Sequence, residues 1–146
     1  MCQISTAEWE VMRVVWASGA IKSSDIIAIL SPKYQWSDST VKTLLGRLVE
    51  KNILGTYRQG RAYIYHALIE EKVLQKEALN VVLESICQRH HSHLLLERLE
   101  DLPMTLEDIA AFQEVLESKK KAAVAVVPCH CLPGQCYCQK KRGIYG

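Results

Sequence analysis

The stretch of sequence that decides the fold spans residues 37–51 and reads SDSTVKTLLGRLVEK. Ser37 is a favourable helix N-cap, and Asn52 is a favourable terminator. Four apolar residues recur at the i, i+3, i+4 and i+7 spacing of a single buried stripe, namely Val41, Leu44, Leu45 and Leu48. We therefore predict a helix from about Asp38 to Lys51, with an opposite polar face typical of helices that enter the DNA major groove.

Two helical segments are predicted before this stretch. Ser5 and Glu8 form a capping-box pattern at the start of the first helix, which Ser18-Gly19 ends. Ser24-Asp25 opens a shorter second helix. We expect Ser31-Pro32 to stop this helix, because proline lacks a backbone donor and disfavours helical conformation in the residue before it.

Two short β-like runs follow the third helix. They span Ile53–Arg58 and Ala62–Ala67, and Gln59-Gly60-Arg61 joins them as a hairpin turn. Three helices and a hairpin with a basic tip are the layout of a winged helix-turn-helix. The predicted fold class is mainly α with a small β-hairpin wing, and the predicted DNA-binding domain covers residues 1–69.

The polar face of the third helix and the hairpin tip supply the candidate DNA contacts. Lys42 can donate to guanine acceptors, and Thr43 can place its methyl group on thymine. The first turn of the helix suits phosphate oxygens, and Arg61 suits a phosphate or the minor groove. The full candidate set is Ser39, Thr40, Lys42, Thr43, Gly46, Arg47 and Arg61. The alternative is that these are ordinary solvated residues.

The charges are segregated along the chain, although the formal net charge is only +2. Residues 33–61 carry six basic and two acidic residues, whereas residues 62–118 carry four basic and eleven acidic residues. Residues 119–146 carry six basic residues and no acidic one. A basic segment followed by an acidic helical one indicates a nucleic-acid face and then a protein interface.

Residues 70–118 are predicted to form a helical dimerisation region. One helix should run from Glu70 to about Gln88, a second should contain Leu94–Leu99, and a last one should begin at Thr105 and carry Phe112. Apolar helices attached to a domain with its own core usually bury a shared surface. A homodimer is the natural arrangement.

The last predicted region, residues 119–146, is a linker followed by a cysteine-rich tail. Two Cys-x-Cys pairs flank Leu132-Pro133-Gly134-Gln135, in which Pro133-Gly134 suits the middle of a type II turn. If the turn closes a hairpin, Cys131 faces Cys136, Cys129 faces Cys138, and the sulfurs share one face. Such a pocket suits Zn(II) or Cu(I). The predicted metal ligands are Cys129, Cys131, Cys136 and Cys138.

Other functions for the cysteines and histidines are less favoured. Disulfides are disfavoured because the sequence shows no signal-peptide pattern, whereas vicinal thiols leave a redox switch open. Cys87 is interpreted as a small core residue, and Cys2 is given no role. The three histidines of a possible second metal site are interpreted as a helix-end or surface feature, namely His90, His91 and His93. His130 should point away from the sulfurs.

Three stretches of the chain resemble the BlaI/MecI/CopY family of winged-helix repressors. They are residues 4–12, ISTAEWEVM; residues 36–48, which contain TVKTLLGRL; and residues 60–63, GRAY. The Cys-x-Cys-x4-Cys-x-Cys tail resembles the copper-responsive CopY branch. That resemblance implies a dimeric repressor of copper-export P-type ATPase genes, which holds double-stranded operator DNA with Zn(II) bound or without metal. Cu(I) filling the thiolates then releases the DNA, and a copper chaperone is a further partner that this interpretation allows.

The antibiotic-responsive branch of the same family is less similar to this sequence. That branch is inactivated by proteolysis at an Asn-Phe bond, whereas Phe112 here follows Ala111. An enzyme is not expected, because the sequence has no glycine-rich phosphate loop, H-E-x-x-H or nucleophile motif. No apolar run has the length of a membrane span, so a cytoplasmic location is expected. The remaining alternatives are a metal-storage or copper-carrier protein and a thiol-redox repressor.

Overall fold

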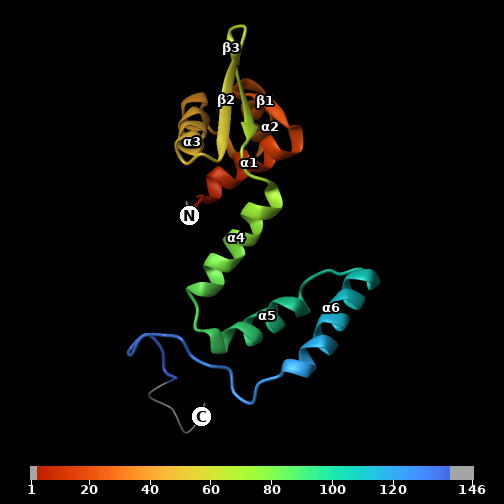
Figure 1. Ribbon diagram of the computed structural model, residues 1–146. Helices are drawn as coiled ribbons and strands as arrows, with labels where there is room; N and C mark the ends of the chain where they lie inside the picture. Colours follow the sequence, from red (N-terminus) through yellow and green to blue (C-terminus); the bar gives the residue numbers. More distant parts are fainter. Residues whose placement is uncertain (1–2, 139–146) are drawn as a thin grey trace. The chain divides into compact units, whose positions relative to one another are not determined.

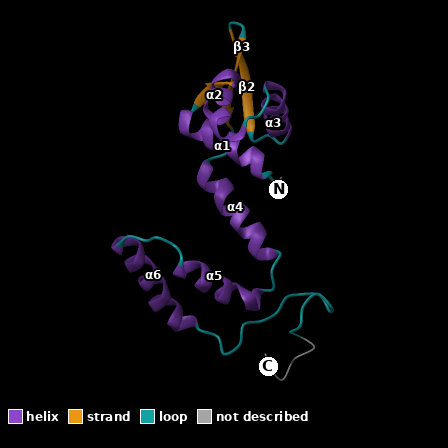
Figure 2. Ribbon diagram, turned by 180° about the vertical axis from the view of Figure 1, so that it is seen from behind, coloured by secondary structure: helices purple, strands orange, loops and turns teal. Residues whose placement is uncertain are grey.

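A computed structural model describes residues 3–138 of the chain (Figure 1). The chain divides into two compact units, Met1–Ala78 and Leu79–Gly146. The first unit contains α1 (Thr6–Ser18), β1 (Ala20–Lys22), α2 (Ser23–Tyr34), α3 (Asp38–Glu50), β2 (Leu54–Gln59) and β3 (Ala62–Ala67). Its sheet is antiparallel with strand order β1-β3-β2. The prediction of a mainly α fold with a small β-hairpin wing is confirmed (Figure 2).

Helix α3 forms as its sequence predicts. The Ser37 hydroxyl accepts from the Thr40 N–H at 3.2 Å, and every residue of the apolar stripe is buried. Asn52 ends the helix in the left-handed conformation, with φ of 59°. The Ile53 N–H reaches back to the Leu48 carbonyl at 3.0 Å, as in a Schellman motif. One face of α3 is therefore fixed in the core and the other is left outside.

The start of α1 is tied to the end of α3 by a largely buried ion pair. Ser5 caps α1 by accepting from the Glu8 N–H at 3.1 Å. The Glu8 carboxylate is only 2% exposed and lies 2.8 Å from the Lys51 ammonium, which also donates to the Gln3 carbonyl. Burial acts to raise the pKa of Glu8, but the hydrogen bonds from Lys51 and Ser5 outweigh burial and lower that pKa.

The first unit has a hydrophobic core of its own. Its largest fully buried side chains come from all three helices and from the start of the hairpin, and they are Met12, Ile26, Leu45, Leu48, Ile53, Leu54, Val11, Val15 and Val41. The Trp16 indole N–H donates to the Ile69 carbonyl at 3.0 Å, which fixes the chain leaving β3. This core packs α3 and the base of the hairpin together with α1 and α2.

Two details of the first unit differ from the prediction. Helix α2 continues past Pro32 to Tyr34, because this proline lies in the last turn, where the hydroxyl of Ser31 donates to the Ala28 carbonyl that the proline cannot satisfy. Strand β1 was not predicted, since three residues are too few for a visible alternation. Ile21 of β1 is buried and pairs with Tyr65 of β3.

The second unit contains the end of α4 (Glu71–Glu84), two short 3-10 helices, α5 (His91–Glu100) and α6 (Leu106–Lys119). The 3-10 helices are Gln88–His90 and Lys120–Ala122. Helix α4 ends before the predicted Gln88, because the chain turns at Ser85. Thr105 and Asp108 form a reciprocal capping box at the start of α6, as expected.

Helices α5 and α6 contain no buried residue. Their exposed large apolar side chains include Leu94, Leu95, Leu96, Leu106, Ile109, Phe112, Val115 and Leu116. Within residues 3–138, no helix combines the length and the apolar character that crossing a membrane requires. The division into regions 1–69, 70–118 and 119–146 that the sequence indicates stays a prediction.

Candidate thiolate centre and nucleic-acid interface

The turn between the two Cys-x-Cys pairs forms as predicted. The Gln135 N–H donates to the Leu132 carbonyl at 3.0 Å, and Gly134 adopts a φ of 91°, which suits the third position of a type II turn. The Gln135 side chain accepts from the Leu132 N–H at 2.9 Å. The tail therefore reverses direction between its two cysteine pairs.

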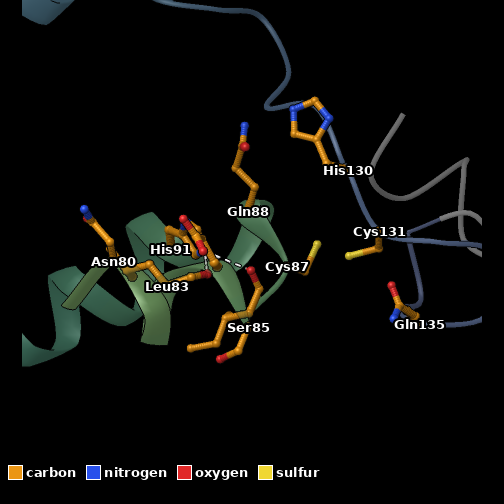
Figure 3. A pocket seen from close by; sticks show the side chains of 11 residues that line it. Asn80, Leu83, Ser85, Cys87, Gln88, His91, His130, Cys131 and Gln135 are labelled. Carbon is orange, nitrogen blue, oxygen red and sulfur yellow. Dashed lines mark hydrogen bonds between the residues drawn. The ribbon is translucent and has the colours of Figure 1, made fainter. Parts of the chain in front are cut away.

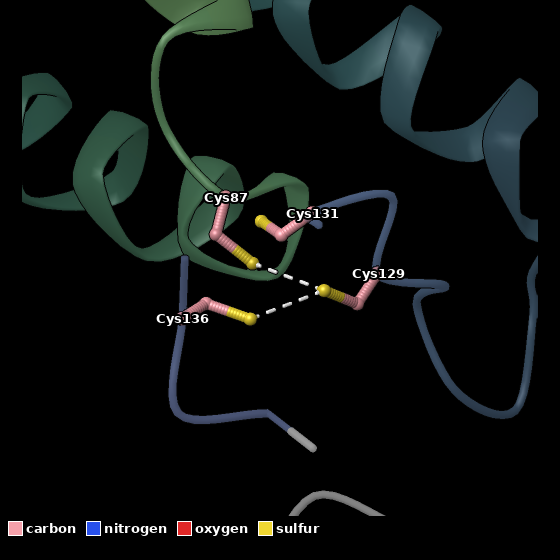
Figure 4. A group of neighbouring side chains, drawn as sticks. All are labelled: Cys87, Cys129, Cys131 and Cys136. Atoms are coloured by element: carbon pink, nitrogen blue, oxygen red, sulfur yellow. Dashed lines mark hydrogen bonds between the residues drawn. The ribbon is translucent and has the colours of Figure 1, made fainter. Parts of the chain in front are cut away.

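The tail sulfurs converge, although not in the predicted register. Residues 129–138 form no β-strand, so no ladder aligns the two arms. The sequence predicts Cys129 opposite Cys138, whereas the Cys129 sulfur lies 3.4 Å from that of Cys136. The sulfurs of Cys129, Cys131 and Cys136 belong to one group whose ligand atoms all lie within 4.8 Å of one another (Figure 4).

The fourth member of that group is Cys87, and the interpretation of Cys87 as a core residue is wrong. Helix α4 stops at Glu84, so Cys87 lies in the connection that follows and is only half-buried. Its sulfur lies 3.8 Å from that of Cys129 and 3.6 Å from that of Cys138. Figure 4 shows the Cys87 side chain meeting the three tail cysteines from a separate segment. No spacing motif links Cys87 to the tail, so only the fold brings it there.

The connection that carries Cys87 is braced by hydrogen bonds. The His91 Nε2 lies 2.7 Å from the Leu83 carbonyl and 2.9 Å from the Ile86 carbonyl (Figure 3). Carbonyl oxygens only accept, so this nitrogen carries the proton. The Arg89 side chain donates to the Val127 carbonyl at 2.7 Å, which fastens the tail next to the cluster. His91 is therefore a positioning residue.

The other histidines do not join the sulfurs. His93 pairs with Glu97 at 2.9 Å on the exposed face of α5, and His90 is exposed. In the described part of the chain, the only group able to hold a metal is the cysteine group. His130 is exposed and lines a cavity of about 630 Å³ together with Cys87, Cys131 and Gln135. This cavity gives solvent a path to two of the sulfurs.

The thiols of the cluster have divergent pKa values. The backbone N–H of Arg89 lowers the pKa of Cys87, and that of Cys131 lowers the pKa of Cys129. Hydrogen bonding to Cys87 raises the pKa of Cys131 to about 12, and burial raises the pKa of Cys138 to about 12. Cys87 and Cys129 therefore lose their protons more readily than Cys131 and Cys138, and a soft cation that binds the sulfurs displaces the protons that remain.

The spacing of the sulfurs fits a metal. In a tetrahedral site with Zn–S bonds of about 2.3 Å, neighbouring sulfurs are separated by about 3.8 Å. Within the group of four, the Sγ–Sγ separation is 3.4 Å between Cys129 and Cys136 and 3.8 Å between Cys87 and Cys129. A donor set made only of sulfur suits Zn(II) or Cu(I), and one chain supplies all of it.

All seven predicted DNA contacts are exposed in the first unit. Six lie along the outer face of α3, and Arg61 lies in the two-residue turn between β2 and β3. The Thr43 hydroxyl donates to the Ser39 carbonyl at 2.9 Å, so the methyl group is what Thr43 offers outward. A Cβ added at Gly46 would meet nothing within 4 Å. The surface has the composition expected of a recognition helix, and its individual base contacts stay a prediction.

Comparison with known families agrees with this fold. Residues 4–118 match the model of the family described as penicillinase repressor. The chain belongs to the penicillinase repressor family. The resemblance to BlaI/MecI/CopY repressors is thereby confirmed, and the family is one of transcriptional repressors rather than of enzymes.

Three proteins illustrate what this chain is similar to. An uncharacterised 16.5 kDa protein in the ptsI 3' region of Latilactobacillus sakei is 39% identical over 139 residues, covering 95% of each chain. The penicillinase repressor of Bacillus licheniformis is 32% identical over 122 residues, covering 81% of this chain and 92% of its own. A solved CopR repressor structure is 45% identical and covers 47% of this chain and 100% of its own, with a TM-score of 0.41.

Proposed function

We propose that this chain is a copper-responsive transcriptional repressor. It binds operator DNA of copper-export P-type ATPase genes as a homodimer, and it leaves that DNA when Cu(I) replaces Zn(II) at the thiolate cluster. The observation that carries the proposal is the convergence of cysteine sulfurs in a chain of the penicillinase repressor family. The cytoplasm, where thiols stay reduced, is the compartment in which such a sensor works.

The DNA-binding half of the proposal rests on α3 and the wing. Lys42 and Thr43 face outward in the middle of α3, where a recognition helix meets base edges. Ser39 and Thr40 lie in its first turn, at the helix N-terminus, where the helix dipole favours a phosphate group. Arg61 at the wing tip and Arg47 supply charge for the backbone.

The dimer half rests on the apolar side chains of the second unit. Leu95 is 49% exposed, Phe112 is 46% exposed and Leu106 is 86% exposed. Large apolar side chains gathered on two helices without buried residues mark an interface. A second copy would cover them and place two reading helices on two half-sites.

The change of metal state acts through geometry in this proposal. Four thiolates with one Zn(II), or with two Cu(I), both leave a site charge of −2, so the field at the DNA hardly changes. For the operator to change from 99:1 occupied to 1:99, the DNA-binding free energies of the zinc and copper forms must differ by about 5.5 kcal/mol. If copper changes the spacing of the two recognition helices in the dimer, the helices can no longer bind both half-sites at once. The loss of DNA-binding free energy can then reach that size.

The test measures binding of the full chain to labelled promoter DNA at one salt concentration, with fluorescence anisotropy as the readout. We expect tight binding with Zn(II) and release on addition of Cu(I), for which a copper chaperone is a candidate donor in the cell. Equal affinity of the zinc and copper forms would contradict the proposal. Binding of copper without any binding of promoter DNA would favour a metal-storage or copper-carrier protein.

A thiol-redox repressor is the second candidate, because two observations favour it. The Cys129 and Cys136 sulfurs are 3.4 Å apart, and the pKa of Cys129 is lowered, so its reactive thiolate is more abundant. This candidate predicts release of DNA by oxidant in metal-free buffer and no release by Cu(I) under reducing conditions.

A further inference from the structure

We propose that Cys87 is a direct thiolate ligand of the metal centre. It completes a four-sulfur Zn(II) set with Cys129, Cys131 and Cys136, and it leaves Cys138 as a fifth sulfur available to Cu(I). This inference rests on the proposed metal-sensing function and changes its ligand set. The Cys-x-Cys pairs of the tail alone would instead give Cys138 the fourth position.

The positions of the sulfurs favour Cys87 over Cys138. The sulfurs of Cys87, Cys129, Cys131 and Cys136 lie mutually within 4.8 Å, as one ion requires of its ligands, and Cys138 is outside that group. The Cys87 sulfur is 3.8 Å from that of Cys129, the separation of about 3.8 Å expected between sulfurs of a tetrahedral zinc site. The Cys138 sulfur lies 3.6 Å from that of Cys87 and also interacts with the Cys136 and Cys129 thiols, but it does not lie within 4.8 Å of every member of the group.

The surroundings of Cys87 hold it at the tail. The ring of His91 bridges the Leu83 and Ile86 carbonyls, which fixes the turn just before Cys87. Just after Cys87, the Arg89 side chain donates to the Val127 carbonyl, two residues before Cys129. The His91 contacts therefore fix the conformation of this segment, and the Arg89 contact joins the segment to the tail independently of the sulfurs. Metal ligands are typically supported by such outer contacts.

A fifth sulfur explains how one cluster serves two metals. Zn(II) is satisfied by four thiolates, whereas each Cu(I) takes two or three. Two Cu(I) that share a bridging sulfur can therefore use five thiolates. The Cys138 thiol releases its proton to join them, and the copper site then carries a charge of −3, one unit more negative than the zinc site. Cys138 is 5% exposed, and its sulfur lies 3.6 Å from that of Cys87 but outside the group of four, so it is within reach of a second ion without being needed for zinc.

Ligation by Cys87 would also connect a change of metal to the C-terminal end of α4. Helix α4 ends at Glu84, and Cys87 follows after Ser85 and Ile86. Leu74, near the start of the same helix, belongs to the core of the first unit. A rearrangement of the sulfurs therefore moves the end of a helix that is continuous with the DNA-binding unit, rather than a free tail.

The experiment compares the full chain with Cys87→Ser, Cys138→Ser and Cys2→Ser under reducing conditions. Cys2 lies outside the described residues and far from Cys87 in sequence, so it serves as the matched loss of one thiol. Zn(II) affinity is measured by competition with a chelator, and thiolate number by the charge-transfer absorbance of the Co(II)-loaded protein. We expect Cys87→Ser to lose about a quarter of that absorbance and at least about 100-fold in Zn(II) affinity.

The controls separate ligation from folding and from the wider proposal. Cys87→His should recover much of the Zn(II) affinity lost in Cys87→Ser, since imidazole ligates zinc, while metal-free DNA binding stays unchanged in both. Cys87→Ser matching Cys2→Ser, with the ligand loss falling on Cys138→Ser, would overturn the role of Cys87 and leave copper sensing intact. Absence of thiolate–metal absorbance in the unaltered chain would overturn both.

Discussion

The two units of this repressor are stabilised in opposite ways. The DNA-binding unit surrounds a closed core in which side chains such as Met12, Leu45 and Leu54 are at most 1% exposed. In the second unit, α5 and α6 bury no residue, and a sulfur cluster and a few hydrogen bonds fasten the tail. The contrast shows that one unit has a closed core of its own, whereas α5 and α6 leave their apolar side chains uncovered. Under the proposed function, a second copy and a metal ion would complete the second unit, and this requirement is what would let the second unit act as a sensor.

The largest expected effect of a single substitution is in the core of the first unit. Leu45→Ala deletes a fully buried side chain of α3 and should lower the free energy of unfolding by about 3 kcal/mol. The matched change Leu95→Ala, at a side chain 49% exposed in α5, should leave the first unit unaffected and weaken self-association. Denaturant unfolding and sedimentation measure the two effects. Similar losses of unfolding free energy in both variants would contradict the view that only the first unit has a closed core.

The next effect concerns the ion pair that joins α1 to α3. Lys51→Met leaves the 2% exposed Glu8 carboxylate without its cation and should cost about 2 kcal/mol at neutral pH. Because folding lowers the pKa of Glu8, its contribution is present above the unfolded value of 4.5 and is lost as pH falls through the folded value. The difference in thermal unfolding between the variant and the unaltered chain should therefore narrow as the pH is lowered from 7 to below 4.5. A constant gap across that range would exclude Glu8 as the cause.

The smallest expected effect is at Gly46, where one substitution should change the free energy of unfolding and the affinity for operator DNA in opposite directions. Gly46→Ala places a methyl group where nothing lies within 4 Å and should raise the free energy of unfolding by roughly 0.5–1 kcal/mol, because alanine is the better helix former. If this face of α3 enters the groove closely, the same methyl group should weaken operator binding. Unfolding and anisotropy measurements on one preparation test both halves. Increased stability with unchanged affinity would place the groove contact elsewhere.

Local sequence signals predicted most of the first unit. The stripe containing Leu44 and Leu48, the Ser37 cap and the Asn52 terminator all act within a few residues, so α3 was predicted with nearly its observed bounds. The signals failed for two reasons: a distant strand decides whether β1 forms, and the rule that proline stops a helix was applied to α2 without regard to the position of the proline in the helix. Strand β1 exists only because Ile21 can pair with β3, and α2 continues through Pro32 because the helix is ending there.

The thiolate centre was predicted in part for the same reason. The turn at Pro133-Gly134 is a local signal, and it correctly brings the two arms of the tail together. Cys87 joins them only because α4 ends early and the tail returns to that point. No pattern within residues 129–138 contains that information. A cysteine next to a helix end with polar neighbours, such as Ser85 and Gln88, was the only available clue.

The most direct test of the account removes two tail sulfurs and measures operator release. The double variant Cys129→Ser, Cys131→Ser leaves the core of the first unit and the outer face of α3 unchanged, so it should bind promoter DNA as tightly as the unaltered chain. Cu(I) should release the unaltered chain under reducing conditions and leave the double variant bound. Release of both proteins at the same copper concentration would contradict the claim that these sulfurs control DNA binding.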